Sequence, residues 1–198
     1  EIFHYVDPNL EIIALIKDGE NVDQNTPIIS IKGKVSSILI SERTVLNFLQ
    51  RLSGIASETK KYVSEISGID CKIIDTRKTT PGLRQLEKYA VRTGGASNHR
   101  MNLSDGILIK DNHIEALKAK GLSLKEGVII AKNKAPHTLK VEVETETLEQ
   151  VQEAIDAGAD IIMLDNMDIT TIQKAVALID KKAIIEVSGG VNLSTVRK

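Results

Sequence analysis

The sequence predicts an α/β protein in which a small domain with an antiparallel sheet precedes a domain of parallel strands. Residues 11–40 carry β-branched alternation that is interrupted by glycine turn signals. From Cys71 onward, short apolar runs instead alternate with helical patterns. The strands expected near Leu139, Ile161 and Ala183 begin 22 residues apart. Strand-helix-strand units of this length indicate parallel strands joined by right-handed crossovers.

The first part of the chain, residues 1–51, is expected to form part of the small α/β domain. Residues 52–198 are expected to form the parallel domain. Within the first part, segments 11–22 and 26–40 are the candidates for antiparallel strands, because β-branched residues alternate there between turn signals.

One long helical pattern covers residues 41–68. Ser41 is its expected N-cap, because a serine side chain accepts hydrogen bonds from the first free N–H groups of a helix. Gly54 is expected to divide the pattern into two helices, of which the first closes the small domain and the second opens the next. The lone Cys71 then begins an apolar run that is expected to be a buried strand.

Five apolar runs are the candidate strands of the parallel domain: KIID, GILIK, LKVEVE, DIIMLD and AIIEVS. They are apolar on both faces, which is typical of a sheet covered by helices. Between them, Thr147 and Gln150 stand in capping-box register, and Gly158 marks the end of a helix. Asp168 is the expected cap of the next helix, and a short helix is expected over residues 192–198.

Composition limits the class of function. The 198 residues are 41% hydrophobic and 27% charged, and the net charge of -1 gives no global field that attracts nucleic acid or an acidic membrane. No apolar run approaches the roughly 20 residues of a membrane-spanning helix, and no signal peptide is visible. A single cysteine cannot form an internal disulfide, which suits a reducing cytoplasm. Because the chain starts without Met and ends within a pattern, we expect a fragment.

Polar residues gather where the predicted strands end: Asp75, Arg77 and Lys78; Lys110 and Asp111; Glu142 and Glu144; Asp165; Glu186 and Ser188. The carboxyl ends of parallel strands form one rim in a (β/α) barrel and one ligand-binding edge in an open doubly wound sheet. Loops are commonly charged, so one such residue alone carries little weight. Charge after five consecutive strands favours a binding or catalytic site.

The residue types at these ends indicate anionic ligands. Four cations, with His99 beside them, form one set: Arg77, Lys78, Arg100 and Lys110. Guanidinium groups bind carboxylates and phosphates in a bidentate manner. The carboxylates of Glu144 and Asp165, without partner cysteines, suit Mg²⁺. Ser188-Gly189-Gly190 precedes the last expected helix, where small residues let backbone N–H groups approach a phosphate.

The residues alone therefore predict an anionic small molecule and a phosphorylated, Mg²⁺-associated one, bound together on a parallel α/β rim. There is no Walker motif, no GxGxxG and no metal-ligand histidine spacing. Cys71 is expected to be a buried packing residue. His113 either orients a neighbouring group or has a structural role.

Six motifs occur in order along the chain: SERTVLNFLQRLSGIAS, DTRKTTPGLRQLEKYAVRTGGASNHR, ILIKDNHI, VEVETETLEQ, GADIIMLDNM and EVSGGVNL. Together they closely resemble the quinolinate phosphoribosyltransferases, also called nicotinate-nucleotide pyrophosphorylases (carboxylating). The resemblance implies a small N-terminal α/β domain of α+β sandwich type and an incomplete (β/α) barrel, both truncated in this chain. It also implies conversion of quinolinate and phosphoribosyl pyrophosphate to nicotinate mononucleotide, pyrophosphate and CO₂, with Mg²⁺, in NAD synthesis.

The resemblance also assigns substrate-binding residues: Arg43, Thr76, Arg77, His99, Arg100, Ser188, Gly189 and Gly190. Of these, Arg77, His99 and Arg100 match residues around the quinolinate carboxylates, and Thr76 belongs to the same substrate loop, DTRKT. The Ser188–Gly190 segment matches the loop that holds the 5′-phosphate.

Four residues match catalytic positions of the family. Lys78 and Lys110 match lysines that line the junction of the two substrates. Glu144 and Asp165 match acidic residues at the ribose hydroxyls and at Mg²⁺, which they hold directly or through water or substrate. Arg43 matches the arginine that reaches from one subunit into its partner's site, which implies a homodimer or a dimer-based oligomer. No nucleic acid or membrane partner is expected.

Three alternatives remain open. The first is a homologous pyrophosphorylase-like protein that acts on another base, including those associated with molybdenum transport. The second is a nicotinate phosphoribosyltransferase, and the third is a non-catalytic ligand-binding fragment, since the family extends further at both ends. The complete set of Arg77, His99 and Arg100 favours a dicarboxylate over a neutral base.

Overall fold

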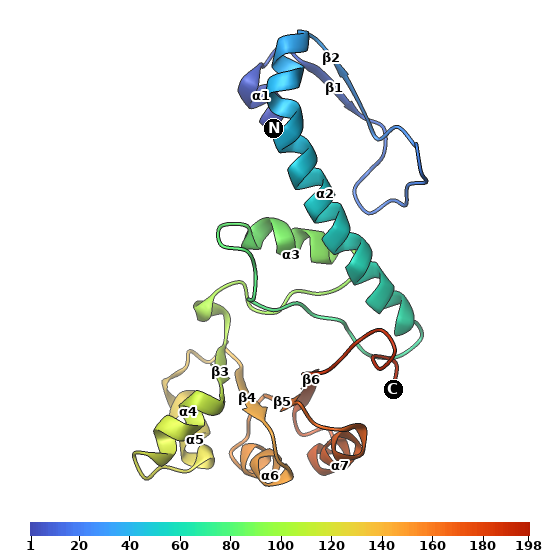
Figure 1. Ribbon diagram of the computed structural model, residues 1–198. Coiled ribbons are helices and arrows are strands. Elements are labelled where there is room, and N and C mark those ends of the chain that lie inside the picture. The colour runs from blue at the N-terminus through green and yellow to red at the C-terminus, as the bar shows by residue number, and fades with distance from the viewer. The chain divides into compact units, whose positions relative to one another are not determined.

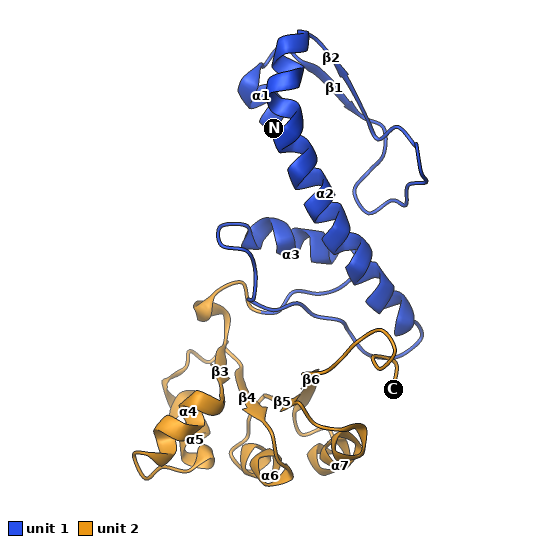
Figure 2. Cartoon of the chain, viewed as in Figure 1, with its two compact units in different colours: residues 1–99 blue, residues 100–198 orange.

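A computed structural model describes residues 1–198, and Figure 1 shows their secondary structure. The chain consists of two units, residues 1–99 and residues 100–198, which are distinguished by colour in Figure 2. The domain boundary predicted after residue 51 stays a prediction, and it falls inside one continuous helix. No helix combines the length and the apolar character that a membrane span requires.

The first unit begins with a short helix and a small antiparallel sheet. Helix α1 (Ile2–Val6) precedes β1 (Glu11–Ala14), which pairs with β2 (Ile29–Lys32) so that Glu11 lies opposite Lys32. The predicted antiparallel sheet is thus confirmed, with strands of only four residues. Residues 35–40, which were also predicted to be extended, are helical instead.

Helix α2 (Val35–Glu65) is one uninterrupted helix of 31 residues. Ser41 is therefore not its N-cap. It lies inside the helix, where its hydroxyl donates to the carbonyl of Ser37 at 2.8 Å, a bond that lets serine sit within a helix. Gly54 does not divide the helix either. Apart from the backbone of its own helix turns, no atom lies within 4 Å of the place where its Cβ would be, and a glycine costs a long helix only about 1 kcal/mol.

The segment between α2 and α3 (Arg84–Thr93) was predicted to open with a buried strand at Cys71. It does not form one, because its only ladder contact is a single parallel bridge between Ile74 and Ser97, and the Cys71 side chain is exposed. Helix α3 ends at Gly94, whose backbone lies close to α2. A Cβ there would come within 2.5 Å of the Ala56 carbonyl oxygen, so only glycine permits this approach.

The second unit is a four-stranded parallel sheet with the strand order β3-β4-β5-β6. Its strands are β3 (Ile107–Ile109), β4 (Val141–Thr145), β5 (Ile161–Asp165) and β6 (Ile184–Ser188). The short 3₁₀ helix η1 (Leu103–Asp105) precedes β3, and the other helices are α4 (Asp111–Lys118), α5 (Leu124–Lys134), α6 (Leu148–Asp156) and α7 (Ile169–Ile179). Four of the five predicted strands are therefore confirmed, all parallel.

Helices α4 to α7 lie on one side of this sheet (Figure 1). Alternate strand residues such as Val143, Ile162 and Leu164 point into the core, where they pack with helix residues such as Val128 and Val151. The prediction that the strands are apolar on both faces was wrong. Side chains alternate between the two faces of a strand, and the other face carries acidic residues. Helices on one face alone are typical of the wall of a (β/α) barrel and not of a doubly wound sheet. The sheet is open in this chain, with β3 and β6 at its edges.

The predicted helix caps of this unit are confirmed. The Thr147 hydroxyl accepts the Gln150 N–H at 3.3 Å, and the Gln150 side chain accepts the Thr147 N–H in return. Asp168 accepts the Thr171 N–H at 2.8 Å at the start of α7. Gly158 follows α6 with a φ of +72°, the left-handed conformation that favours glycine. Local sequence thus fixes where these helices begin and end, and the strands follow between them.

Two glycine substitutions test this account of α2. We expect Gly54→Ala to raise the free energy of unfolding by about 0.5–1 kcal/mol, because the site is open and alanine restricts the unfolded chain. The matched variant Gly94→Ala should lower it by about 1–3 kcal/mol, because its Cβ meets the Ala56 carbonyl. Urea unfolding followed by circular dichroism measures both. Destabilisation by Gly54→Ala would contradict the view that this glycine is an unused break.

Candidate functional site

The helix-free face of the second unit's sheet carries a row of polar side chains. Glu142 and Glu144 lie on β4, Asp165 ends β5, and Glu186 and Ser188 lie on β6. In the strand register, Glu144 is opposite Met163, which is opposite Glu186. Asp165 is opposite Ser188. The register thus places these side chains on one face, with Glu144, Asp165 and Ser188 towards the carboxyl end of the sheet.

Lys110 and Glu144 meet at this end of the sheet. The Lys110 ammonium lies 3.5 Å from Glu144 Oε2, and the Glu144 side chain is only 14% exposed. Lys110 is also the residue before α4, and its backbone N–H donates to His113 Nδ1 at 2.9 Å. His113 therefore has a structural role, which was one of the two roles predicted for it. Its ring fixes the turn from which the Lys110 side chain extends.

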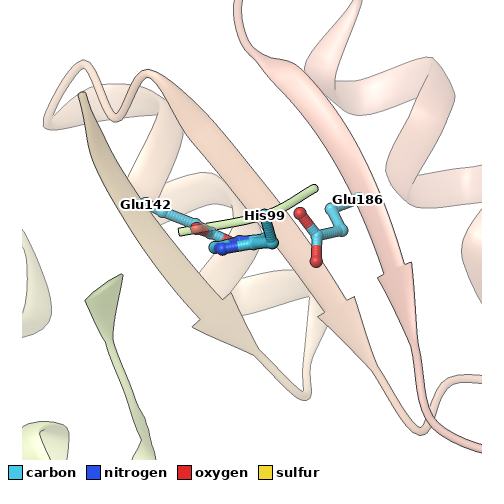
Figure 3. A group of neighbouring side chains, drawn as sticks. All are labelled: His99, Glu142 and Glu186. Atoms are coloured by element: carbon cyan, nitrogen blue, oxygen red, sulfur yellow. The ribbon is translucent and has the colours of Figure 1, made fainter. Parts of the chain in front are cut away.

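Glu142 is the most buried acid of this face, with 3% of its surface exposed. Figure 3 shows Glu142 and Glu186 pointing toward one another across the middle strand, β5. Glu186 is one of the groups that act on the pKa of the Glu142 carboxyl.

Burial raises the pKa of the Glu142 carboxyl above its usual range, and nearby Glu144 raises it further. The positive charges of Arg100 and Lys110 and the hydrogen bond with Glu186 act in the opposite direction. Sequence reasoning noticed Glu142 and Glu186 at strand ends but assigned them no role. The signal available was their position two residues before Glu144 and Ser188, on the same face of the sheet.

Asp165 is held by its neighbour Asn166, which sequence reasoning missed. The Asn166 amide donates to Asp165 Oδ2 at 2.6 Å, and its backbone N–H donates to the Ser188 carbonyl at 2.9 Å. Asn166 has a φ of +53°, a conformation in which asparagine is several-fold enriched. A Cβ on Gly189 would lie 2.1 Å from Asn166 Oδ1, so glycine is required there. The acidic residue and the glycine loop therefore form one structural unit.

The helix predicted after Gly190 is wrong. Residues 193–197 form hydrogen-bonded turns in which the Asn192 side chain accepts the Ser194 N–H at 3.0 Å. Asn192 satisfies the free N–H groups itself, as an asparagine often does in a turn. Ser188 ends β6, and Gly189 and Gly190 follow it in a loop in which both have positive φ, so no helix N-terminus supports their N–H groups.

In the first unit, the predicted cationic loop is well ordered by its own bonds. The Thr76 hydroxyl accepts the Lys78 N–H at 3.0 Å, and the Lys78 side chain is exposed. Arg77 is half-buried, and its buried Nε has no hydrogen-bond partner. The His99 backbone N–H donates to Asp75 Oδ1 at 2.8 Å, so Asp75 links this loop to the segment that carries His99. A buried guanidinium nitrogen without a partner marks a place where an anion would be favourable.

The remaining predicted residues are Arg100 and Arg43. Arg100 belongs to the second unit, where its guanidinium donates to the Gly106 carbonyl at 2.8 Å and lies near enough to Glu142 to act on its pKa. Arg43 lies on α2 with an exposed side chain and forms no salt bridge with Glu42. The structure thus gathers Lys110, Glu144, Asp165 and the Ser188–Gly190 loop in one unit, and Thr76, Arg77, Lys78 and His99 in the other.

Sequence comparison gives a family for both units. The profile described as "Quinolinate phosphoribosyl transferase, N-terminal domain" matches residues 1–53, and the one described as the C-terminal domain of the same enzyme matches residues 55–198. A probable nicotinate-nucleotide pyrophosphorylase [carboxylating] of Synechocystis sp. is 45% identical over 98% of this chain and 65% of its own length. A protein of the same description from Bacillus subtilis is 46% identical over 98% of this chain and 66% of its own.

Solved structures agree. NadC from Streptococcus pyogenes has a TM-score of 0.92 and 45% identity, over 98% of this chain and 68% of that one. The nicotinate-nucleotide pyrophosphorylase from Francisella tularensis has a TM-score of 0.93 and 43% identity, over 100% of this chain and 69% of that one. The chain spans slightly more than two thirds of the length of these two solved structures. It spans slightly less than two thirds of the length of the Synechocystis and Bacillus subtilis proteins. Matches that cover almost every residue in both sequence and structure show that the chain belongs to the quinolinate phosphoribosyl transferase family.

Proposed function

We propose that the protein transfers the phosphoribosyl group of phosphoribosyl pyrophosphate to quinolinate, with loss of CO₂, to give nicotinate mononucleotide and pyrophosphate for NAD synthesis. The observation that carries the proposal is the group at the carboxyl end of the parallel sheet, where Lys110 meets Glu144 at 3.5 Å and Asn166 joins Asp165 to the glycine loop. Carboxylates, a lysine and a loop of small residues suit a phosphorylated sugar. The single exposed cysteine is compatible with a cytoplasmic location.

Quinolinate is the proposed ligand of the cationic residues. It is a dianion, and Arg77, His99 and Arg100 supply donors for two carboxylates. The buried, unpartnered Nε of Arg77 supports an anion at that position. Clamping both carboxylates would orient the ring nitrogen toward the ribose C1 atom and convert a two-substrate encounter into an oriented one.

The residues of the second unit fit Mg²⁺ with a phosphorylated sugar. Glu144 and Asp165 are hard oxygen donors on neighbouring strands of the same sheet face, and Mg²⁺ usually binds through one or two carboxylates plus substrate phosphates. When bound, this ion would neutralise charge on the departing pyrophosphate. Glu144 and Asp165 would also accept hydrogen bonds from the ribose hydroxyls, and the Ser188–Gly190 backbone would donate to the 5′-phosphate.

The chemistry needs no covalent nucleophile. The C1–oxygen bond to pyrophosphate breaks with its electron pair on the leaving group, and the quinolinate nitrogen gives its lone pair to C1. Lys78 and Lys110 would stabilise the pyrophosphate electrostatically. The ring nitrogen then carries positive charge, so the ring accepts the electron pair released when the 2-carboxylate leaves as CO₂. A proton finally replaces the carboxylate on that carbon.

The first test of this function is substrate choice. We expect CO₂ release that depends on quinolinate, phosphoribosyl pyrophosphate and Mg²⁺ together, and little turnover of nicotinate. Nicotinate lacks one carboxylate, and leaving a cation that becomes buried in the complex without its partner costs roughly 2–5 kcal/mol. Radiolabelled CO₂ release and nucleotide chromatography measure the two reactions. Comparable turnover of both bases would favour a nicotinate enzyme, and turnover of neither would favour another base or a binding role.

The second test separates the two substrates. Asp165→Asn and Glu144→Gln each remove one charge while keeping the shape of the side chain. We expect both to weaken the use of phosphoribosyl pyrophosphate with Mg²⁺ by at least about tenfold, while quinolinate affinity changes little. Steady-state kinetics and calorimetric titration of quinolinate measure this difference. An equal loss of affinity for quinolinate would show that the acidic pair is wrongly assigned.

The third test concerns Arg43 and the oligomer. We propose that Arg43, which is exposed on α2, enters the site of a partner subunit in a homodimer or dimer-based assembly. Arg43→Ala and Asp165→Asn should each be nearly inactive. Mixed and allowed to exchange subunits, they form a heterodimer in which one site has both defects and the other has neither. Activity should return, to at most about half of wild type per heterodimer under C₂ symmetry.

Subunit exchange can be followed independently with differently tagged subunits. If exchange occurs and no activity returns, Arg43 acts within its own chain or has no part in catalysis. An exposed arginine in an ordinary surface salt bridge would be worth only about 0–1 kcal/mol, so that reading predicts a mild effect of Arg43→Ala alone.

A further inference from the structure

Helix α3 buries charged residues and exposes apolar ones, the reverse of what is usual for a helix that packs on another helix. Its charged residues Glu87 and Lys88 are buried, with 8% and 1% of their surface exposed. The larger apolar residues Leu86 and Tyr89 are about 40% exposed. Charged groups are rarely buried unless they are paired, so the side of α3 that faces inward must serve polar partners.

Lys88 is the most buried of these residues and has two partners. Its ammonium forms a salt bridge with Asp75 Oδ1 and donates to the His99 carbonyl at 3.1 Å. Asp75 begins the DTRK loop, which carries Arg77 and Lys78. His99 ends the segment that follows α3. One buried ammonium therefore bonds to both predicted quinolinate-binding segments.

Asp75 and Asn98 complete the connection. The two oxygens of Asp75 accept the His99 N–H at 2.8 Å and the Asn98 amide at 2.6 Å. The same Asn98 amide nitrogen donates to the Lys88 carbonyl at 3.0 Å, and the Arg92 guanidinium donates to Asn98 Oδ1. Each member of the network has more than one bond, so the relative position of the two segments is determined several times over.

The N-terminal half of α3 holds the other end of the DTRK loop. Arg84 donates to the Arg77 carbonyl at 3.3 Å and to the Thr79 hydroxyl at 3.1 Å. Glu87 accepts the Thr80 N–H at 3.2 Å, and Arg51 of α2 donates to Glu87 at 3.0 Å. Partial burial alone would raise the pKa of Glu87, but the bonds from Arg51 and Thr80 hold it below its usual range. Positions 84, 87 and 88 lie on one helix face, which is turned to the loop.

We propose that Lys88 is a positioning residue for quinolinate. Through Asp75 it fixes the segments that carry Arg77 and His99 in one arrangement, without touching the substrate. The inference rests on the proposed function and adds to it the residue that sets the spacing of the carboxylate-binding groups. A displacement of about 1 Å in such groups is enough to cost about 100-fold in rate.

Stability alone does not account for the pair. Replacing a buried ion pair by apolar residues of similar volume is often neutral or stabilising, whereas removing one partner leaves a buried charge. A purely structural Lys88–Asp75 pair could therefore be exchanged for neutral residues without loss of function. A positioning pair could not be exchanged in this way, because Asp75 also accepts hydrogen bonds from the His99 backbone N–H and from the Asn98 side-chain amide.

The test uses Lys88→Met and the double variant Asp75→Asn/Lys88→Met. The single variant leaves the Asp75 carboxylate without its partner and could unfold for that reason. The double variant removes both charges and is therefore expected to keep the fold. Lys61→Met is the matched control, because Lys61 is an exposed lysine on α2 paired only with Glu58. Calorimetry measures the affinity for quinolinate and, separately, for phosphoribosyl pyrophosphate with Mg²⁺. Hydrogen exchange measures protection of the amides in residues 75–80 and 97–99.

We expect both Lys88 variants to lose about 10- to 100-fold in quinolinate affinity and less than threefold in phosphoribosyl pyrophosphate affinity, with faster exchange in both segments. The control should match wild type throughout. Recovery of quinolinate affinity in the double variant, equal losses for both substrates, or unchanged exchange in the two segments would each overturn the inference. If wild type itself binds neither substrate, the proposed function fails, and the exchange measurements alone decide whether Lys88 orders the two segments.

Discussion

The alternation of side chains along β4, β5 and β6 is the constraint on which the second unit depends. Each strand has one row, such as Val141 and Val143, that packs against the helices, and one row, such as Glu142 and Glu144, that does not. A shift of one residue in register would exchange the two rows and bury the acids among the helices. The apolar core therefore also fixes which carboxylates share a face and which residues stand at the carboxyl end of the sheet.

In the first unit, the comparable role falls to buried charge. The loop that carries Arg77 has almost no ladder of its own, since Ile74 makes one bridge and Cys71 is exposed. A loop of this kind needs partners from elsewhere to take a single conformation, because ordering each backbone residue costs roughly 1–2 kcal/mol. Helix α3 provides them through Arg84, Glu87 and Lys88. The close approach of Gly94 to α2 in turn sets where α3 lies.

Sequence reasoning succeeded where the determinants are local or periodic. Thr147, Gln150 and Asp168 cap their helices as predicted, since capping depends on residues three apart. It failed where tertiary contacts decide. A serine such as Ser41 can either cap a helix or bond to the carbonyl of the preceding turn, and here it does the second. The segment KIID has the composition of a strand but forms only one bridge, between Ile74 and Ser97. Most residues assigned to the site were marked by their charge after the predicted strands as well as by matching motifs, and only Arg43 and Thr76 by the motifs alone. Asn166 and Lys88 act through neighbours and become visible only in three dimensions.

A net charge of -1 conceals a strong segregation of charge, and this segregation explains how the chain could hold two anionic substrates. Cations are concentrated on the segments that contain Arg77, Lys78 and Arg100, where they would meet carboxylates. The sheet face is acidic, with Glu142, Glu144 and Asp165, and would repel an anion that came without a cation. On the proposed function, that face would favour a phosphorylated ligand that arrives with a divalent ion, while Lys110 beside Glu144 offsets part of its charge. On this proposal, local charge, and not the total, would set which substrate each part of the chain accepts.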